Sequence, residues 1–165
     1  QPMPAPATRT IPPMKISIYV SPVDNRVPLT PTQCKQLQGQ YPSISLFVQS
    51  SNVRCFQDVE YQDLGIQLVD DISNCDVLLG IKEVPIANLI RNKTYFFFSH
   101  TIKKQEYNRA LLQAMVAKKI EMIDYEVIRN AKGKRLLGFG RYAGIIGAYN
   151  GLFTYGLKCL KQILT

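Results

Sequence analysis

The sequence DVLLG at residues 76–80 decides the fold, because it is short and almost wholly apolar. Four further runs have the same character: KISIYV at 15–20, ISLFV at 44–48, TYFFF at 94–98 and IEMI at 120–123. Continuous apolar runs of this length, without in-out alternation, are typical of strands that are buried on both faces of a parallel sheet. The five runs therefore predict the strands of such a sheet.

Helical patterns separate these runs. Thr30 followed by Pro31 predicts a helix start, with the threonine as the cap and the proline in the first helical position. Residues 57–64 predict a short helix before an edge strand at 66–69, and residues 104–119 carry apolar side chains at helical spacing. Strands that alternate with helices predict an α/β domain, an open and mostly parallel sheet with helices on both faces.

The two ends of the chain differ from this central pattern. We divide the chain into a proline-rich leader at 1–14, an α/β domain at 15–140 and a long C-terminal helix at 141–165. Residues 127–139 flank a turn and predict a hairpin before the helix. The glycines in GFGRYAGIIG, at 138–147, match a dinucleotide-binding loop only weakly, since their spacing is wrong and no βαβ unit follows.

Composition excludes several classes of protein. The chain has 165 residues and a formal charge of +8, which favours an anionic partner. The basic clusters are not interleaved with aromatic residues, so we expect no nucleic-acid binding. Four isolated cysteines and a single histidine predict no metal site. The apolar part of the last helix is shorter than the roughly 18 residues of a membrane span, so we expect no membrane partner.

Polar residues follow the predicted strands at the edge where ligands bind in open α/β sheets. Arg26 follows the first strand, Lys82 the strand at 76–80, His100 the strand at 94–98, and Glu126 the strand at 120–123. Each residue alone is more simply explained as a solvated charge or a structural histidine. Their shared position at the strand ends favours a functional site.

Such a set of side chains suits acid–base chemistry on a carboxylate substrate. Arginine binds a carboxylate through its planar fork, and a partly desolvated lysine beside a histidine can titrate near neutrality. Two such groups suit proton transfer at a carbonyl or imine carbon. The sequence has no evident Ser-His-Asp arrangement or P-loop, which disfavours hydrolases and kinases.

Five blocks of sequence resemble a known family. They are NRVPLTP at 25–31, GIKE at 80–83, FFSHT at 97–101, DYE at 124–126 and FGRYAG at 139–144. In this order they resemble the N-terminal domain of the alanine dehydrogenase and pyridine nucleotide transhydrogenase superfamily. The FFSHT and DYE blocks are most similar to the branch of saccharopine dehydrogenase and lysine–ketoglutarate reductase. The resemblance covers about residues 15–158.

The resemblance implies roles for individual residues. In that family a substrate domain of flavodoxin-like topology packs against a Rossmann domain, with the active site between them. The resemblance implies that Lys82 and His100 form the acid–base pair at the imine carbon. The resemblance further implies that Arg26 and Arg135 bind carboxylates of the substrate. It implies that Glu83 and Glu126 hold the substrate amine or tune the lysine and the histidine. The loop at 21–24 departs from the family, since it lacks the glutamate often found ahead of Arg26.

The resemblance also implies a reaction. An amino acid and a 2-oxo acid, such as lysine and 2-oxoglutarate, condense to an imine that takes a hydride from NAD or NADP in its reduced form. The cofactor would be bound mainly by a Rossmann domain absent from this chain, so the fragment alone is expected to be inactive. We expect a homo-oligomer in the cytoplasm, or in mitochondria if a precursor is processed. Alanine dehydrogenase and a stand-alone amino-acid or dicarboxylate binding module remain the alternatives.

Overall fold

A computed structural model describes residues 13–20 and 24–163. The chain forms two compact units, Gln1–Tyr125 and Glu126–Thr165. Each unit is described by itself below. Most of the predicted leader lies outside the described residues, but Met14 is already part of the first strand and pairs with Ile44.

The first unit contains a six-stranded sheet in which every pairing is parallel. Its strands are β1 (Met14–Ile18), β2 (Ile44–Gln49), β3 (Gln67–Val69), β4 (Val77–Leu79), β5 (Thr94–Phe97) and β6 (Glu121–Asp124). Their order is β3-β2-β1-β4-β5-β6, which confirms β3 as an edge strand. Without this short edge strand the order is that of a flavodoxin-like sheet. The chain changes direction across the sheet between β1 and β4.

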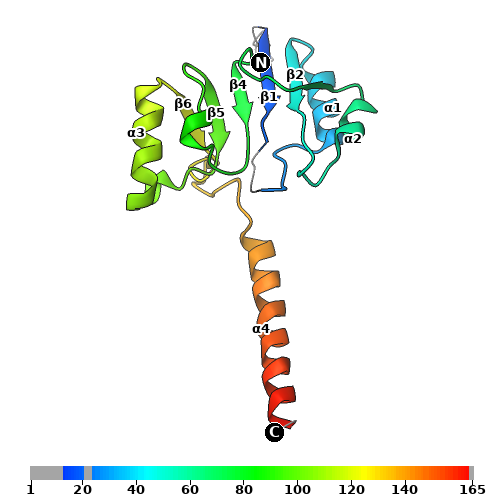
Figure 1. Ribbon diagram of the computed structural model, residues 1–165, viewed down its shortest axis with the longest axis vertical. Helices are drawn as coiled ribbons and strands as arrows, with labels where there is room; N and C mark the ends of the chain where they lie inside the picture. Colours follow the sequence, from blue (N-terminus) through cyan, green and yellow to red (C-terminus); the bar gives the residue numbers. More distant parts are fainter. Residues whose placement is uncertain (1–12, 21–23, 164–165) are drawn as a thin grey trace, which may run out of the picture. The chain divides into compact units, whose positions relative to one another are not determined.

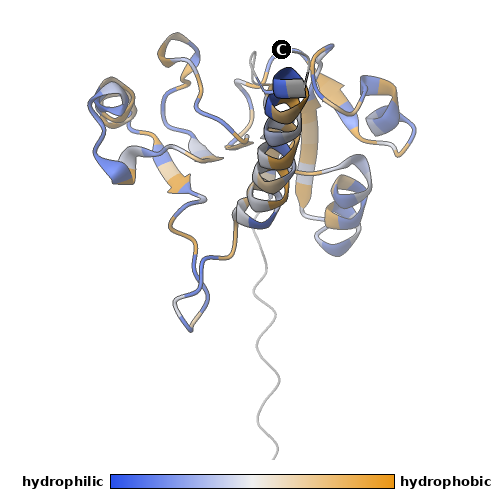
Figure 2. Ribbon diagram, turned by 90° about the horizontal axis from the view of Figure 1, so that it is seen from below, coloured by the Kyte–Doolittle hydropathy of each residue, from blue (hydrophilic) through white to orange (hydrophobic). Residues whose placement is uncertain are grey.

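Helices cover both faces of the sheet, as the sequence predicts. Figure 1 shows α1 (Pro31–Gln40) and α2 (Asp58–Gln62) on the side of β2, and α3 (Arg109–Ala117) on the side of β6. Two buried clusters lie in the core: one includes Cys34 of α1 and Tyr61 of α2, and the other includes Leu111 and Met115 of α3. In Figure 2 the strands carry much of the hydrophobic colour. The two clusters explain why the strands are apolar on both sides.

Helix α1 begins where the sequence predicts. The Oγ1 atom of Thr30 accepts a hydrogen bond from the backbone N–H of Gln33 at 3.3 Å. The side chain of Gln33 accepts one from the backbone N–H of Thr30 at 2.9 Å. Together the two bonds form a capping box, which fixes the point where the chain leaves the loop after β1.

The predicted helix at 104–119 is wrong at its start. The segment instead forms two 3-10 turns, η2 (Thr101–Lys103) and η3 (Glu106–Asn108), and α3 begins only at Arg109. Lys104 adopts a left-handed conformation with φ of 53°, and Gln105 is extended. A left-handed residue cannot continue a right-handed helix. The turns therefore shape the chain directly after His100.

The second unit contains α4 (Gly140–Ile163), a helix of 24 residues that confirms the predicted C-terminal helix. The predicted hairpin at 127–139 is reduced to one antiparallel bridge between Arg129 and Arg135. Gly133 closes its turn with φ of 74°, a conformation that favours glycine. Many apolar side chains of α4 are exposed, among them Tyr149 and Leu152. Among the described residues, no helix combines the length and apolar character needed to cross a membrane.

Candidate active site at the carboxyl edge of the sheet

Three segments that carry candidate residues follow neighbouring strands. Arg26 lies in the loop after β1, Lys82 follows β4, and His100 follows β5. The strands β1, β4 and β5 are adjacent in the sheet, and all point the same way. The three segments therefore leave the sheet at one edge, beside the position where the strand order reverses. Open α/β sheets bind ligands at this position.

Arg26 is held by a carboxylate of its own loop. Its Nε donates to Oδ1 of Asp24 at 2.9 Å, and its Nη2 donates to Oδ2 at 2.5 Å. The hydrogen-bonded guanidinium lowers the pKa of the Asp24 carboxyl, and the nearby charge of Lys82 adds to this lowering. Asp24 is not among the site residues that the sequence predicts. The structure shows that Asp24 supplies a carboxylate to Arg26 and lies within electrostatic range of Lys82.

Lys82 is positioned through its backbone by a buried tyrosine. The hydroxyl of Tyr19 donates to the carbonyl oxygen of Lys82 at 2.6 Å. The tyrosine ring lies directly over Gly80, where an added Cβ would be 1.9 Å from Cζ of Tyr19. Glycine is therefore required at this position, because it lets the ring cross the end of β4. Burial raises the pKa of the Tyr19 hydroxyl well above its usual range, so it stays a donor even at a pH where an exposed tyrosine ionises.

His100 pairs with the residue that follows Lys82. Its Nδ1 lies 2.6 Å from Oε1 of Glu83, and both side chains are partly exposed. A neutral imidazole that donates its Nδ1 proton to a carboxylate keeps Nε2 as a hydrogen-bond acceptor. Within the described part of the chain, no hydrogen bond or ion pair joins the ammonium of Lys82 to this His–Glu pair. Glu83 is the chain neighbour of Lys82, and its side chain contacts His100.

A buried polar network holds the backbone of His100, which has φ of 56°. Ser99 is fully buried, and its Oγ donates to Oδ2 of Asp124 at 2.6 Å. The same Oγ accepts the N–H of Thr101 at 3.1 Å, and the amide of Asn108 donates to the carbonyl of His100 at 3.3 Å. Left-handed backbone is strained for a residue other than glycine, so these contacts hold the histidine in place. The sequence blocks contain Ser99 and Asp124, but nothing in the sequence showed that they meet.

Glu126 and Arg135 belong to the second unit. The structure brings these two predicted residues together, with Nη2 of Arg135 3.5 Å from Oε1 of Glu126. Such a pair joins the carboxylate and guanidinium that the sequence assigned separately to the substrate. Its relation to Lys82 and His100 stays a prediction.

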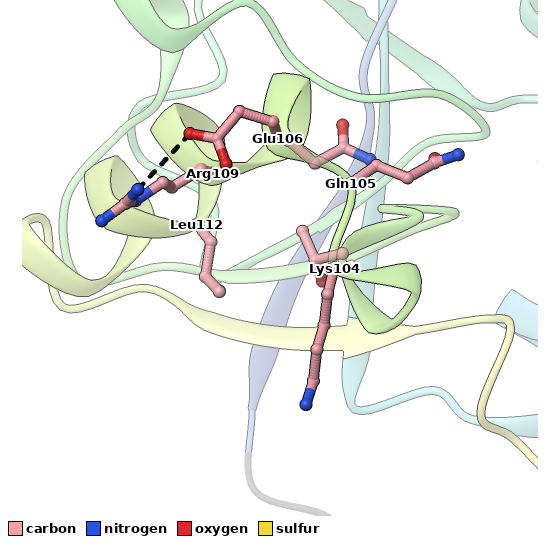
Figure 3. Close-up of a pocket in the computed structure, with 7 residues that line it drawn as sticks. Lys104, Gln105, Glu106, Arg109 and Leu112 are labelled. Atoms are coloured by element: carbon pink, nitrogen blue, oxygen red, sulfur yellow. Dashed lines mark hydrogen bonds and ion pairs between the residues drawn. The ribbon is translucent and has the colours of Figure 1, made fainter.

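A hollow of about 280 Å³ lies beside the site, formed by residues between Thr101 and Leu112. Figure 3 shows Lys104, Glu106 and Arg109 around it, with Glu106 paired to Arg109 at 3.4 Å. Neither Lys82 nor the His100 ring lines this hollow. The candidate residues therefore lie at the strand ends and not in this hollow.

The described residues contain no group of three or more histidine, cysteine, aspartate or glutamate side chains that could hold a metal ion. The polar groups at the strand ends are instead a guanidinium, an ammonium and an imidazole, each with a carboxylate nearby. The domain is thus a doubly wound α/β domain, and the side chains at its switch point are of types that can transfer protons and bind anions.

Comparison with known proteins agrees with this class. Residues 20–146 match the family model "Alanine dehydrogenase/PNT, N-terminal domain". The chain belongs to this family. It is similar to alpha-aminoadipic semialdehyde synthase of Arabidopsis thaliana, with 38% identity over 86% of this chain and 13% of the relative. It is also similar to saccharopine dehydrogenase [NAD(+), L-lysine-forming] of Yarrowia lipolytica, with 29% identity over 83% of this chain and 38% of the relative.

Solved structures share the fold. An L-alanine dehydrogenase superposes with a TM-score of 0.60 at 18% identity, covering 73% of this chain and 35% of that protein. A transhydrogenase from Sinorhizobium meliloti gives a TM-score of 0.57 at 16% identity, covering 71% of this chain and 37% of that protein. The chain therefore spans well under half the length of the relatives it matches.

Proposed function

We propose that the chain is the substrate-binding domain of an NAD(P)-dependent oxidoreductase that acts on the CH–NH bond of saccharopine or a similar secondary amine. One observation carries the proposal: Lys82 and the His100–Glu83 pair follow adjacent strands at the switch point of a domain whose relatives include saccharopine dehydrogenases. The names of these relatives support the substrate class. The cofactor, NAD or NADP, would be held mainly by a further domain.

Each group has a defined task in this proposal. Arg26 binds a substrate carboxylate through its planar fork. Lys82 and His100 transfer the protons that are needed when the amine adds to the 2-oxo acid, when water leaves, and when the imine is reduced. Glu83 holds the imidazole in one orientation through Nδ1. Glu126 and Arg135 would hold the substrate amine and a second carboxylate, and their ion pair keeps the two side chains adjacent.

The test uses the complete enzyme. We expect Lys82→Met and His100→Gln each to lower kcat about a hundredfold or more, since each removes a proton-transfer group. Lys35→Met serves as a matched control, because Lys35 is an exposed lysine on α1. All three variants should keep the wild-type circular dichroism spectrum. Wild-type rates in both site variants would refute the assignment.

The choice of substrates separates the alternatives. Activity with lysine and 2-oxoglutarate supports the proposal, whereas activity only with pyruvate and ammonia would assign the chain to an alanine dehydrogenase. Binding of amino acids or dicarboxylates without turnover of either pair would favour a binding module. Gel filtration tests the proposed homo-oligomer. Fractionation of cells tests the proposed cytoplasmic location against a mitochondrial one, which the names of the mammalian relatives favour.

A further inference from the structure

The segment that carries Arg26 is attached at one end to the loop after β2 and at the other end to α2. The backbone N–H of Cys55 donates to the carbonyl of Asn25 at 2.7 Å. The hydroxyl of Tyr61 donates to the carbonyl of Leu29 at 3.1 Å. Arg26 lies between these two hydrogen bonds, so its backbone position depends on where Cys55 and Tyr61 are held.

A buried arginine organises the loop after β2. The side chain of Arg54 is only 4% exposed. Its Nη1 donates to the carbonyl of Gln49, at the end of β2, at 2.5 Å, and its Nε donates to the carbonyl of Phe56 at 2.8 Å. Its Nη2 pairs with Asp58, the first residue of α2. One guanidinium therefore joins the end of the strand, the loop and the start of the helix.

The same guanidinium also contacts the second attachment point. Its Cζ atom lies 4.6 Å from the centre of the Tyr61 ring, a cation–π geometry. Tyr61 is fully buried. Cys55, the first attachment point, is the residue next to Arg54 in the chain. Arg54 therefore fixes both groups that hold the Arg26 segment.

A buried charge is costly unless every donor finds a partner. A methionine or leucine would fill this space more simply, and the loop does not need a charge for solubility because the group is buried. The fork of an arginine is suited to joining several carbonyls and a carboxylate at fixed angles. These contacts suit a residue that sets the geometry of the loop.

We propose that Arg54 is a positioning residue, which acts through Cys55 and Tyr61 to hold Arg26 where it binds the substrate carboxylate. The inference rests on the proposed function in one respect, the contact between Arg26 and a carboxylate. Arg54 itself touches no substrate. Its loss is expected to weaken binding of the substrate that Arg26 contacts, because small displacements of a binding group cause large losses.

The experiment compares KM and kcat in the complete enzyme with lysine and 2-oxoglutarate as substrates. The variants are Arg26→Met, Arg54→Met, Arg54→Lys and Tyr61→Phe, the last of which removes only the hydroxyl that holds Leu29. The control is Arg91→Met, since Arg91 is an exposed arginine before β5, at the end of the sheet where the strands begin. We expect Arg54→Met to raise KM about tenfold for the same substrate that Arg26→Met affects. Arg54→Lys and Tyr61→Phe should raise it less, and Arg91→Met should leave it unchanged.

A double variant distinguishes positioning from general stability. In the Arg26→Met background, Arg54→Met should cause little further rise in KM, because two residues that act through one contact are not additive. Unchanged KM in Arg54→Met and Tyr61→Phe, beside a raised KM in Arg26→Met, overturns this inference alone. If Arg54→Met does not fold, an unchanged KM in Tyr61→Phe is sufficient to overturn it. Unchanged KM in Arg26→Met instead removes the proposed role of Arg26, and with it this inference.

Discussion

Replacement of Gly80 by alanine tests the packing that positions Lys82. The new methyl group would lie 1.9 Å from Cζ and 2.1 Å from the hydroxyl oxygen of Tyr19. Carbon atoms normally stay about 3.5 Å apart, so the ring must retreat by about 1.5 Å. The ring is buried and packs edge-on against the ring of Tyr95, with the two ring centres 6.1 Å apart, which leaves it little room.

The expected cost follows from two terms. Overpacking in a core typically costs about 1 to 3 kcal/mol. Loss of the hydrogen bond from Tyr19 to the carbonyl of Lys82 adds about 1 kcal/mol. Gly80→Ala should therefore lower the free energy of unfolding by about 2 to 4 kcal/mol. In the complete enzyme it should also lower kcat, because the Lys82 backbone is released.

Urea unfolding of the 165-residue chain, followed by near-ultraviolet circular dichroism of packed tyrosines, measures the cost. Gly39→Ala is the matched control, because its added Cβ meets nothing within 4 Å and alanine is favoured in a helix. In a Tyr19→Leu background, which removes the clashing ring atoms, the cost of Gly80→Ala should fall to less than about 1 kcal/mol. An equal cost in both backgrounds would refute the reasoning.

Three further predictions concern single side chains. Glu83→Ala removes the group that accepts the Nδ1 proton of His100, so it should lower kcat of the complete enzyme about tenfold or more. Glu83→Gln keeps an acceptor oxygen and should lower kcat less. Equal rates in wild type and Glu83→Ala would contradict the pairing. Burial raises the pKa of the Cys34 thiol to about 11, so in the native chain a disulfide reagent should modify the exposed Cys55 first. Peptide mass spectrometry measures which cysteine is modified. Fast modification of both thiols would argue against the burial of Cys34. Burial raises the pKa of the Tyr125 hydroxyl to about 12, so as the pH rises the unfolded chain loses this proton before the folded chain does. The stability that the buried hydroxyl contributes is complete below about pH 10 and declines as the pH rises toward the folded pKa. A urea midpoint that does not fall between these two pH values would contradict this prediction.

The sheet could be predicted because its signal is local. Strands buried on both faces need apolar side chains at successive positions, and the run TYFFF provides them whatever lies elsewhere in the chain. The helix at 104–119 was placed too early because its apolar spacing continues through Tyr107. That side chain is 71% exposed and precedes the true helix start at Arg109. Spacing alone could not reveal the left-handed turn at Lys104.

Part of the site could be predicted for a related reason. The positions of Arg26, Lys82 and His100 after β1, β4 and β5 are predictable because each residue follows a recognisable strand, which is again local information. Their supporting contacts join distant segments. The bond from Tyr19 reaches Lys82 across 63 residues, and Ser99 meets Asp124 across 25. No spacing rule predicts such pairs, so the sequence indicates candidate site residues but not the contacts that hold them.

The strand order places the candidate site residues at one edge of the sheet. Neighbouring strands lie about 4.8 Å apart, so the chain leaves β1, β4 and β5 from three points spanning about 10 Å at one edge of the sheet. A guanidinium, an ammonium and an imidazole therefore lie on segments that leave the same edge of the sheet, although these segments are far apart in sequence. The loop after β2 supplies none of the assigned site residues, but its buried Arg54 fixes the first of these three segments. The edge strand β3 pairs with β2 and supplies none of the assigned side chains. We therefore expect substitutions at the ends of β1, β4 and β5 to change binding and turnover, and substitutions in β3 to act mainly on stability.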